Sequence, residues 1–390
     1  MKIERVECIP MVYPMKDPIY SGTGKCDARQ LLLVRIYTDT GLVGLGESAP
    51  YGGPVQSTQR IVEEEIAPLL IGEDPVNTER LWYKCYFTHF QHGRGGIFIS
   101  ALSGVDIALW DLKGKIAGLP LYQLLGGFRS RIPVYASGGF YGTDKSIGDL
   151  VKEAEACRDR GMHGFKMKVG RTAAPFSLRV FNNSDTDCPM VTLEEDLERV
   201  AEVKRALGEG CPLMLDANTN WDFQTALKAG KEFDKIGIHF LEEPVRTDDY
   251  EGSARLAKEL VTKIAGYETE CMTTNYARMI RMGAMDIVQP DLSWCGGITV
   301  GMKIAALAEA AFLECSTHVW NSGIIVAASA HVTAAIQNGA VMEYDITENA
   351  FREELMVDPL RPKEDGMIEL PKAPGLGVEV REEVIEKYHL

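Results

Sequence analysis

The sequence predicts an α/β protein in which an α+β N-terminal capping domain precedes a (β/α)-barrel of the (β/α)7β type, a modified TIM barrel. Two observations lead to this prediction. The first third of the chain reads as strands followed by helices, and beyond residue 130 short apolar strands alternate with longer amphipathic stretches. A chain of 390 residues also fits one large domain and one smaller domain. We expect the capping domain over residues 1–125 and the barrel over 126–360.

The capping domain is predicted from a change of pattern near residue 50. Residues 30–37 and 43–47 alternate like strands, and the turn residues Asp39-Thr40-Gly41 separate them. From about 56 to 125 the pattern becomes helical, most clearly over residues 101–113, where apolar side chains recur at helical spacing.

The barrel is predicted from eight short apolar segments with a helical pattern in every gap. Examples of these helices are residues 193–207 and 298–311, and the last strand is followed by a tail rather than an obvious helix. The connection 171–191 is unusually long, which is typical of a functional lid. The expected strands are 132–136, 164–169, 212–216, 239–242, 263–268, 286–291, 311–317 and 340–344.

Composition excludes several classes of function. Forty-one Lys and Arg against 56 Asp and Glu give a net charge of −15, which disfavours binding to nucleic acid or an anionic membrane. No apolar run approaches the ~18 residues of a membrane span, and the first residues lack a signal-peptide pattern. Nine scattered cysteines, an odd number, predict reduced thiols and a cytoplasmic protein. An anionic substrate would need local positive charge from lysines or a metal ion.

Three predicted strands end in carboxylates at regular spacing. Twenty-six residues separate Asp216 from Glu242, and 26 separate Glu242 from Glu268. One βα unit per step places the three side chains on adjacent strands at the carboxyl end of the barrel, where they converge. Converging anions need a cation, and oxygen-only ligands favour Mg²⁺. The alternative is that each residue begins a solvated loop, which explains any single one better than all three in register.

Other ionisable residues are predicted at the same end of the barrel. Lys166 and Lys168 are two residues apart on one strand and therefore share a face, so each should lower the other's pKa and make one a base near neutral pH. Asp291 and His318 end the sixth and seventh expected strands and are 27 residues apart. They are predicted to form an acid–base pair in which the carboxylate raises the imidazole pKa. Glu343 near the last strand would donate a hydrogen bond to substrate if protonated. A surface lysine pair, a structural histidine and a solvated glutamate are the corresponding alternatives.

These motifs together resemble the enolase superfamily, specifically its mandelate racemase subgroup, over nearly the whole chain. The resemblance implies Mg²⁺ bound by Asp216, Glu242 and Glu268. It also implies catalytic or substrate-binding roles for the remaining motif residues, which are Lys166, Lys168, Asn218, Asp291, His318 and Glu343. Specificity loops of the cap would correspond to residues 15–30 and to the turn at Tyr51, and the tail from about 360 to 390 would return to the cap.

The resemblance also implies a function. The expected reaction is removal of the proton α to a carboxylate through an enediolate. The acid-sugar dehydratases of this subgroup favour dehydration of an aldonate or aldarate to a 2-keto-3-deoxy acid by a homo-oligomer. Racemisation or epimerisation of an α-hydroxy acid, and a barrel that only binds sugar acids, are the alternatives. Forty-eight residues separate Lys168 from Asp216, longer than a usual βα step, so substrate specificity does not carry over.

Overall fold

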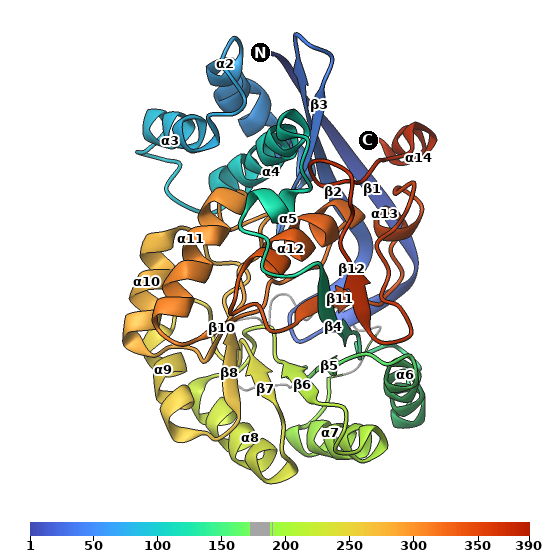
Figure 1. Cartoon of the computed structure of the whole chain (residues 1–390). Coiled ribbons are helices and arrows are strands. Elements are labelled where there is room, and N and C mark those ends of the chain that lie inside the picture. The colour runs from blue at the N-terminus through green and yellow to red at the C-terminus, as the bar shows by residue number, and fades with distance from the viewer. Residues whose placement is uncertain (172–187, 189) are drawn as a thin grey trace.

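The computed structural model describes residues 1–171, 188 and 190–390 and contains two layers of different architecture (Figure 1). The lid role expected for 171–191 falls almost wholly outside the described residues. In the first layer two long strands and one short strand pair antiparallel in the order β1-β2-β3 and are followed by helices. The elements are β1 (Ile3–Ser21), β2 (Gly24–Thr38), β3 (Val43–Ser48), α1 (Val55–Ile61), the π-helical turn η1 (Val62–Ile66), α2 (Ala67–Leu70), α3 (Thr78–Thr88), α4 (Ile97–Ala117) and α5 (Leu121–Leu124).

The second layer is the predicted barrel, in which all eight expected strands occur. They are parallel and follow the order β10-β9-β8-β7-β6-β5-β4-β11. Between β10 and β11, the ends of this path, the Ser316 hydroxyl donates to the Val341 carbonyl at 2.8 Å. The strands are β4 (Arg131–Ser137), β5 (Phe165–Lys168), β6 (Leu213–Asp216), β7 (Phe240–Glu242), β8 (Lys263–Gly266), β9 (Ile287–Val288), β10 (Glu314–Cys315) and β11 (Met342–Asp345).

Helices alternate with these strands, so the fold class predicted from the sequence is confirmed. The helix expected over residues 193–207 has those bounds in the structure. The helix that comes directly after β11, α13 (Ala350–Glu353), has only four residues, in agreement with a barrel that lacks its last full helix. The barrel helices are α6 (Ile147–Asp159), α7 (Leu193–Leu207), α8 (Phe223–Ile236), α9 (Tyr250–Glu259), α10 (Thr273–Met282), α11 (Gly297–Ala310) and α12 (Gly323–Ala335).

The C-terminal tail runs from the barrel back across the cap. Its strand β12 (Met367–Glu369) pairs antiparallel with β4, and its helix α14 (Glu382–Tyr388) contacts β1. The Leu376 amide donates to Asp111 of α4 at 2.7 Å, and the Leu390 amide donates to the Pro10 carbonyl at 3.0 Å. The C-terminal tail therefore connects the barrel to the cap a second time. Among the described helices none is long and apolar enough to cross a membrane.

The cap is docked on the barrel mouth through two buried carboxylates. Helices α11 and α12 begin at the carboxyl ends of barrel strands, and their first amides have no partner within the helix and can donate hydrogen bonds to the cap. Asp106 of α4 accepts from the Thr299 amide at 2.8 Å and the Thr299 hydroxyl at 2.6 Å. Glu47 of β3 accepts from the amides of Ser322 and Ile325, both at 3.2 Å. Because the N-terminal end of a helix is the positive end of its dipole, these contacts fix the cap over the mouth.

Complete burial raises the pKa of Asp106 to about 7, although the hydrogen bonds from Thr299 oppose this shift. An unfolded aspartate titrates near ~4. Between about pH 4 and pH 7 the unfolded chain therefore binds fewer protons at this site than the folded chain does. The contribution of Asp106 to the free energy of unfolding falls as the pH rises through this range.

We therefore expect Asp106→Asn, which cannot ionise, to gain stability relative to the parent chain as the pH rises. The difference in melting temperature between variant and parent should increase by ~2 °C from pH 5 to pH 8, the shift that about 1 kcal/mol produces in a large domain. Thermal unfolding followed by circular dichroism measures this difference. The exposed Asp144→Asn is the matched control, and a difference for Asp106→Asn that stays flat or falls would contradict the account.

Candidate metal and acid–base site

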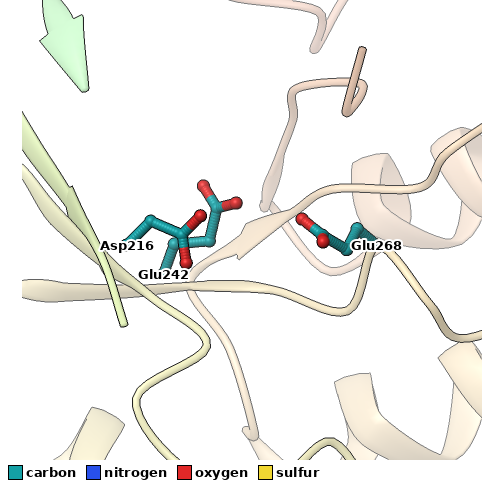
Figure 2. A group of neighbouring side chains, drawn as sticks. All are labelled: Asp216, Glu242 and Glu268. Carbon is teal, nitrogen blue, oxygen red and sulfur yellow. The ribbon is translucent and has the colours of Figure 1, made fainter. Parts of the chain in front are cut away.

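Three carboxylates converge at the carboxyl ends of neighbouring strands. Asp216 and Glu242 are paired residues at the ends of β6 and β7, and Glu268 follows β8. Each offers an oxygen atom, and these atoms all lie within 4.8 Å of one another. Figure 2 shows the carboxylates turned toward a common point. The arrangement expected from the 26-residue spacing is therefore present in the structure.

This donor set fits a hard divalent cation. Opposite ligands of an octahedral Mg²⁺ ion are about 4.2 Å apart, twice the ~2.1 Å bond length, so small side-chain rotations would bring all three oxygens into its coordination sphere. Asp216 and Glu242 are buried and Glu268 is partly exposed. Burial raises the pKa of Glu242 to about 8, and the neighbouring charges of Asp216, Glu343 and Glu268 add to this shift while Lys166 opposes it. Such crowding of negative charge favours binding of a cation.

Lys166 and Lys168 lie on the same face of β5, as predicted, but both are paired with carboxylates. The Lys166 ammonium lies 2.7 Å from Oε2 of Glu242 and 2.7 Å from Oε1 of Glu343, and Lys168 forms an ion pair with Asp216. Burial and Lys166 both lower the pKa of Lys168, but the charges of Asp216, Glu242 and Glu268 act in the other direction and the pKa is raised overall. The net depression expected for this lysine pair is therefore wrong for the structure.

Glu343 is present at the mouth but differs from the expected protonated hydrogen-bond donor. Burial raises the pKa of Glu343, but the charges of Lys166 and His318 oppose burial, and the pKa is lowered overall to about 2. Its second oxygen accepts from the Val319 amide at 3.1 Å. Glu343 is therefore an ionised hydrogen-bond acceptor. The sequence pattern could not predict this, because it did not show that Lys166 would contact Glu343 directly.

His318 and Asp291 form the expected pair. Nδ1 of His318 lies 2.8 Å from Oδ2 of Asp291, and Nε2 lies 3.1 Å from Glu268. Burial lowers the pKa of His318, but Glu268, Glu343 and the hydrogen bond to Asp291 raise it to about 10. The direction agrees with the prediction, and the ring presents Nε2 toward the carboxylate cluster.

The backbone next to all three carboxylates is strained. Asn218 has φ of 44°, Glu243 has 40° and Tyr267 has 76°, in a region that residues with side chains rarely adopt. The strained turn at Asn218 lets its own amide and side-chain nitrogen donate to Asp216, at 2.7 and 3.1 Å. Strain of this kind persists where surrounding contacts over-determine the geometry, and it commonly marks functional sites.

The turn at Tyr51 was expected as a specificity loop, but two side-chain contacts at this site were not predicted from the sequence. The Tyr51 hydroxyl, from the cap, donates to Oδ2 of Asp291 at 2.7 Å. The Gln289 side chain donates to Oε2 of Glu242 at 3.0 Å. Gln289 precedes Asp291 by two residues and so shares its face of the strand, a signal that could have identified it. Tyr51 reaches the site only through cap docking, and no local pattern predicts that contact.

A cavity of about 390 Å³ separates the barrel mouth from the cap. Its barrel side includes Lys168, Glu268 and His318, and its cap side includes Ser21, Lys25 and Tyr51. One candidate metal ligand, Glu268, and both candidate acid–base groups, Lys168 and His318, thus line a single space large enough for a small molecule.

Gln289 orients Glu242, so its loss should weaken metal binding. We expect Gln289→Met to reduce Mn²⁺ or Mg²⁺ affinity about 10-fold, the lower end of effects seen when a hydrogen bond to a metal ligand is removed. Isothermal titration calorimetry measures the affinity, and circular dichroism checks folding. The control is Gln123→Met on α5, and equal affinity in both variants would show that Gln289 does not position the carboxylate.

Comparison with known proteins agrees with this geometry. Residues 149–384 match the family model "Enolase C-terminal domain-like", and residues 5–126 match the mandelate racemase / muconate lactonizing enzyme N-terminal domain. An arabinonate dehydratase of Saccharolobus solfataricus is 36% identical and the match covers 92% of this chain and 90% of the relative. A D-galactarolactone cycloisomerase of Agrobacterium fabrum is 32% identical over 100% of this chain and 99% of the relative.

Solved structures give the same result. The crystal structure of a racemase from Streptomyces coelicolor with bound magnesium superposes with a TM-score of 0.85 at 31% identity, covering 100% of both chains. Matches to both family models cover nearly the whole chain, and the same fold is found in the solved neighbour. The chain therefore belongs to the enolase superfamily, within its mandelate racemase / muconate lactonizing enzyme group.

Proposed function

We propose that this protein is a Mg²⁺-dependent dehydratase that converts an acid sugar, an aldonate or aldarate, to a 2-keto-3-deoxy acid. The observation that carries the proposal is a cluster of three carboxylates, Asp216, Glu242 and Glu268, at a cavity that Glu268 lines together with Lys168 and His318. The relatives named as arabinonate dehydratase and D-galactarolactone cycloisomerase support carboxylic acid sugars as the substrate class.

In this proposal Asp216, Glu242 and Glu268 hold the Mg²⁺ ion, and Asn218 keeps Asp216 in place while it lines the cavity. The bound ion supplies positive charge next to the substrate carboxylate, which makes the α-proton more acidic. Lys166 and Glu343 form a buried ion pair beside the cluster, and Lys166 adds a second positive charge to the end where the carboxylate binds.

Lys168 and His318 are the proton-transfer groups. They come from β5 and from the turn after β10, on opposite sides of the carboxylate cluster. Lys168 must be neutral to accept a proton, and sharing the Asp216 charge with a cation would lower its pKa. Asp291 holds His318 through Nδ1, so Nε2 is the atom that exchanges a proton with the substrate.

Dehydration then follows from one proton removal and one proton delivery. One group removes the α-proton, and the electron pair left on the α-carbon forms a carbon–carbon double bond as the β-carbon–oxygen bond breaks. A protonated group delivers its proton to the departing hydroxide, which leaves as water. The resulting enol becomes the 2-keto acid, so atoms and charge balance.

An isomerase is the second candidate, favoured by the cycloisomerase relative. If the β-oxygen belonged to a ring, the same bond cleavage would open the ring without releasing water. Without a leaving group, the group on the other face could return a proton, which gives racemisation or epimerisation. A barrel that only binds sugar acids explains the cavity but not two separate groups placed for proton transfer.

We also propose a homo-oligomer that works in the cytoplasm. The oligomer rests on family membership alone. The reducing compartment is supported by the nine cysteines, all of which are free thiols and eight of which are buried.

The direct test is a panel of aldonates and aldarates incubated with the protein and Mg²⁺, with products analysed by mass spectrometry and a 2-keto acid assay. We expect a keto acid lighter by one water, no activity after chelation by EDTA, and recovery with Mg²⁺. Glu242→Gln should bind the ion far more weakly, because a charged ligand becomes neutral. Full turnover after thorough chelation would contradict the metal site, and a product of unchanged mass would favour the isomerase.

The two proton-transfer groups should fail differently. We expect Lys168→Ala to reduce exchange of the α-hydrogen that faces the lysine by ~100-fold or more, and His318→Asn to keep that exchange but block product formation. Asp291→Asn should resemble His318→Asn more weakly, since the imidazole remains. Nuclear magnetic resonance in D₂O measures exchange beside turnover. Equal loss of both in Lys168→Ala and His318→Asn, for every stereoisomer, would show that the two do not act on separate faces.

A further inference from the structure

The cap side of the cavity has chemistry of its own. Opposite the catalytic wall, the turn and strand at the β1–β2 connection contribute Ser21, Thr23 and Lys25 to the lining. Two hydroxyls and an ammonium form a polar, cationic surface, which suits a hydroxylated or anionic end of a ligand rather than an apolar one.

This hairpin is fixed to the barrel, so its side chains have defined positions over the mouth. The backbones of Tyr20 and Tyr141 exchange hydrogen bonds of 3.1 and 3.0 Å. The buried Arg171 guanidinium donates to the Ser21 carbonyl at 3.0 Å. A Cβ atom added at Gly22 would lie 3.0 Å from a backbone oxygen of the barrel, so only glycine permits this approach without adjustment. The cap wall is therefore a built surface of the cavity.

Lys25 is the charge that the hairpin presents to this cavity. One ion-pair partner, Asp27 on the same strand, lies 3.7 Å away, beyond hydrogen-bond length. The Lys25 side chain is 25% exposed and lines the cavity, so its ammonium group adds positive charge to the cap wall. Arg29, the next cation along the strand, is buried and bonded to Asp345 at 3.0 Å.

We propose that Lys25, with the hydroxyls of Ser21 and Thr23, binds the distal carboxylate of the substrate, so that the preferred acid sugar is a dicarboxylate, an aldarate. This inference rests on the proposed function, because the other carboxylate must occupy the catalytic end. In a chain with a net charge of −15, an anionic end group needs a local cation. The terminal hydroxymethyl group of an aldonate would not need one.

Equilibrium binding tests the assignment without turnover. The probes are 2-oxoglutarate and 2-oxopentanoate, which have equal chain length and differ by the distal carboxylate, titrated calorimetrically into the Mg²⁺-loaded protein. The diacid should bind the parent chain about 10-fold or more tightly than the monoacid, the effect of one charge-assisted hydrogen bond. Lys25→Met should reduce this preference to roughly 2-fold or less, and Lys25→Arg should keep most of it.

The matched control is Lys16→Met, which removes the same charge from an exposed position of the same hairpin and should leave the preference unchanged. Equal affinity for the two acids in the parent chain, or no detectable binding of either, would overturn the Lys25 assignment. So would a diacid preference that survives Lys25→Met or is lost equally in Lys16→Met.

Kinetics with matched hexarates and hexonates separates failure of this inference from failure of the proposed function. We expect Lys25→Met to raise KM for hexarates with little change in kcat, and to leave hexonates unaffected. No α-hydrogen exchange with any acid would contradict the proposed function itself. Turnover of hexonates as efficient as that of hexarates would contradict only the role of Lys25.

Discussion

The constraint on which the site depends is the concentration of negative charge at the ends of three adjacent strands. Asp216, Glu242 and Glu268 are brought within a few ångströms by the register of β6, β7 and β8. Carboxylates at this distance in a buried site cannot all stay ionised without positive charge nearby. The lysines of β5 and the imidazole of His318 supply part of this charge, and the geometry of the cluster suits a divalent cation for the rest. Two of the groups that balance this charge, Lys168 and His318, are those proposed to move protons.

The cap is also held over the site by carboxylates, which here bind the amides of barrel helices. Buried carboxylates of the cap, Glu47 and Asp106, accept hydrogen bonds from the positive ends of α12 and α11. This docking fixes the hairpin and Tyr51 over the barrel mouth, so the cavity has one wall from each layer. In the proposed function the barrel wall holds the reacting end of the substrate, and the cap wall contacts the other end.

Periodicity was sufficient to predict the barrel, because most of the short apolar strands are buried on both faces and most of the intervening helices have one buried face; α12, which is buried almost throughout, is the exception. The regular spacing of Asp216, Glu242 and Glu268 predicted their convergence for the same reason. Protonation could not be predicted, since it depends on distances between side chains of different strands. The sequence predicted a base near neutral pH at one lysine of the Lys166–Lys168 pair, and a hydrogen-bond donor at Glu343 if that residue is protonated. The ion pairs of Lys168 with Asp216 and of Lys166 with Glu343 instead raise the pKa of Lys168 and lower that of Glu343. Tyr51 and the left-handed backbone at Glu243 leave no local pattern, because tertiary packing imposes them.

The central claim, that the three carboxylates form one divalent-cation site, is tested most directly by crystallography with Mn²⁺ and anomalous diffraction at the manganese edge. The account predicts one strong anomalous peak bonded to an oxygen of each of Asp216, Glu242 and Glu268, with Lys168 displaced from Asp216. An anomalous peak elsewhere, or no peak while Lys168 and Lys166 remain paired with Asp216 and Glu242, would contradict it.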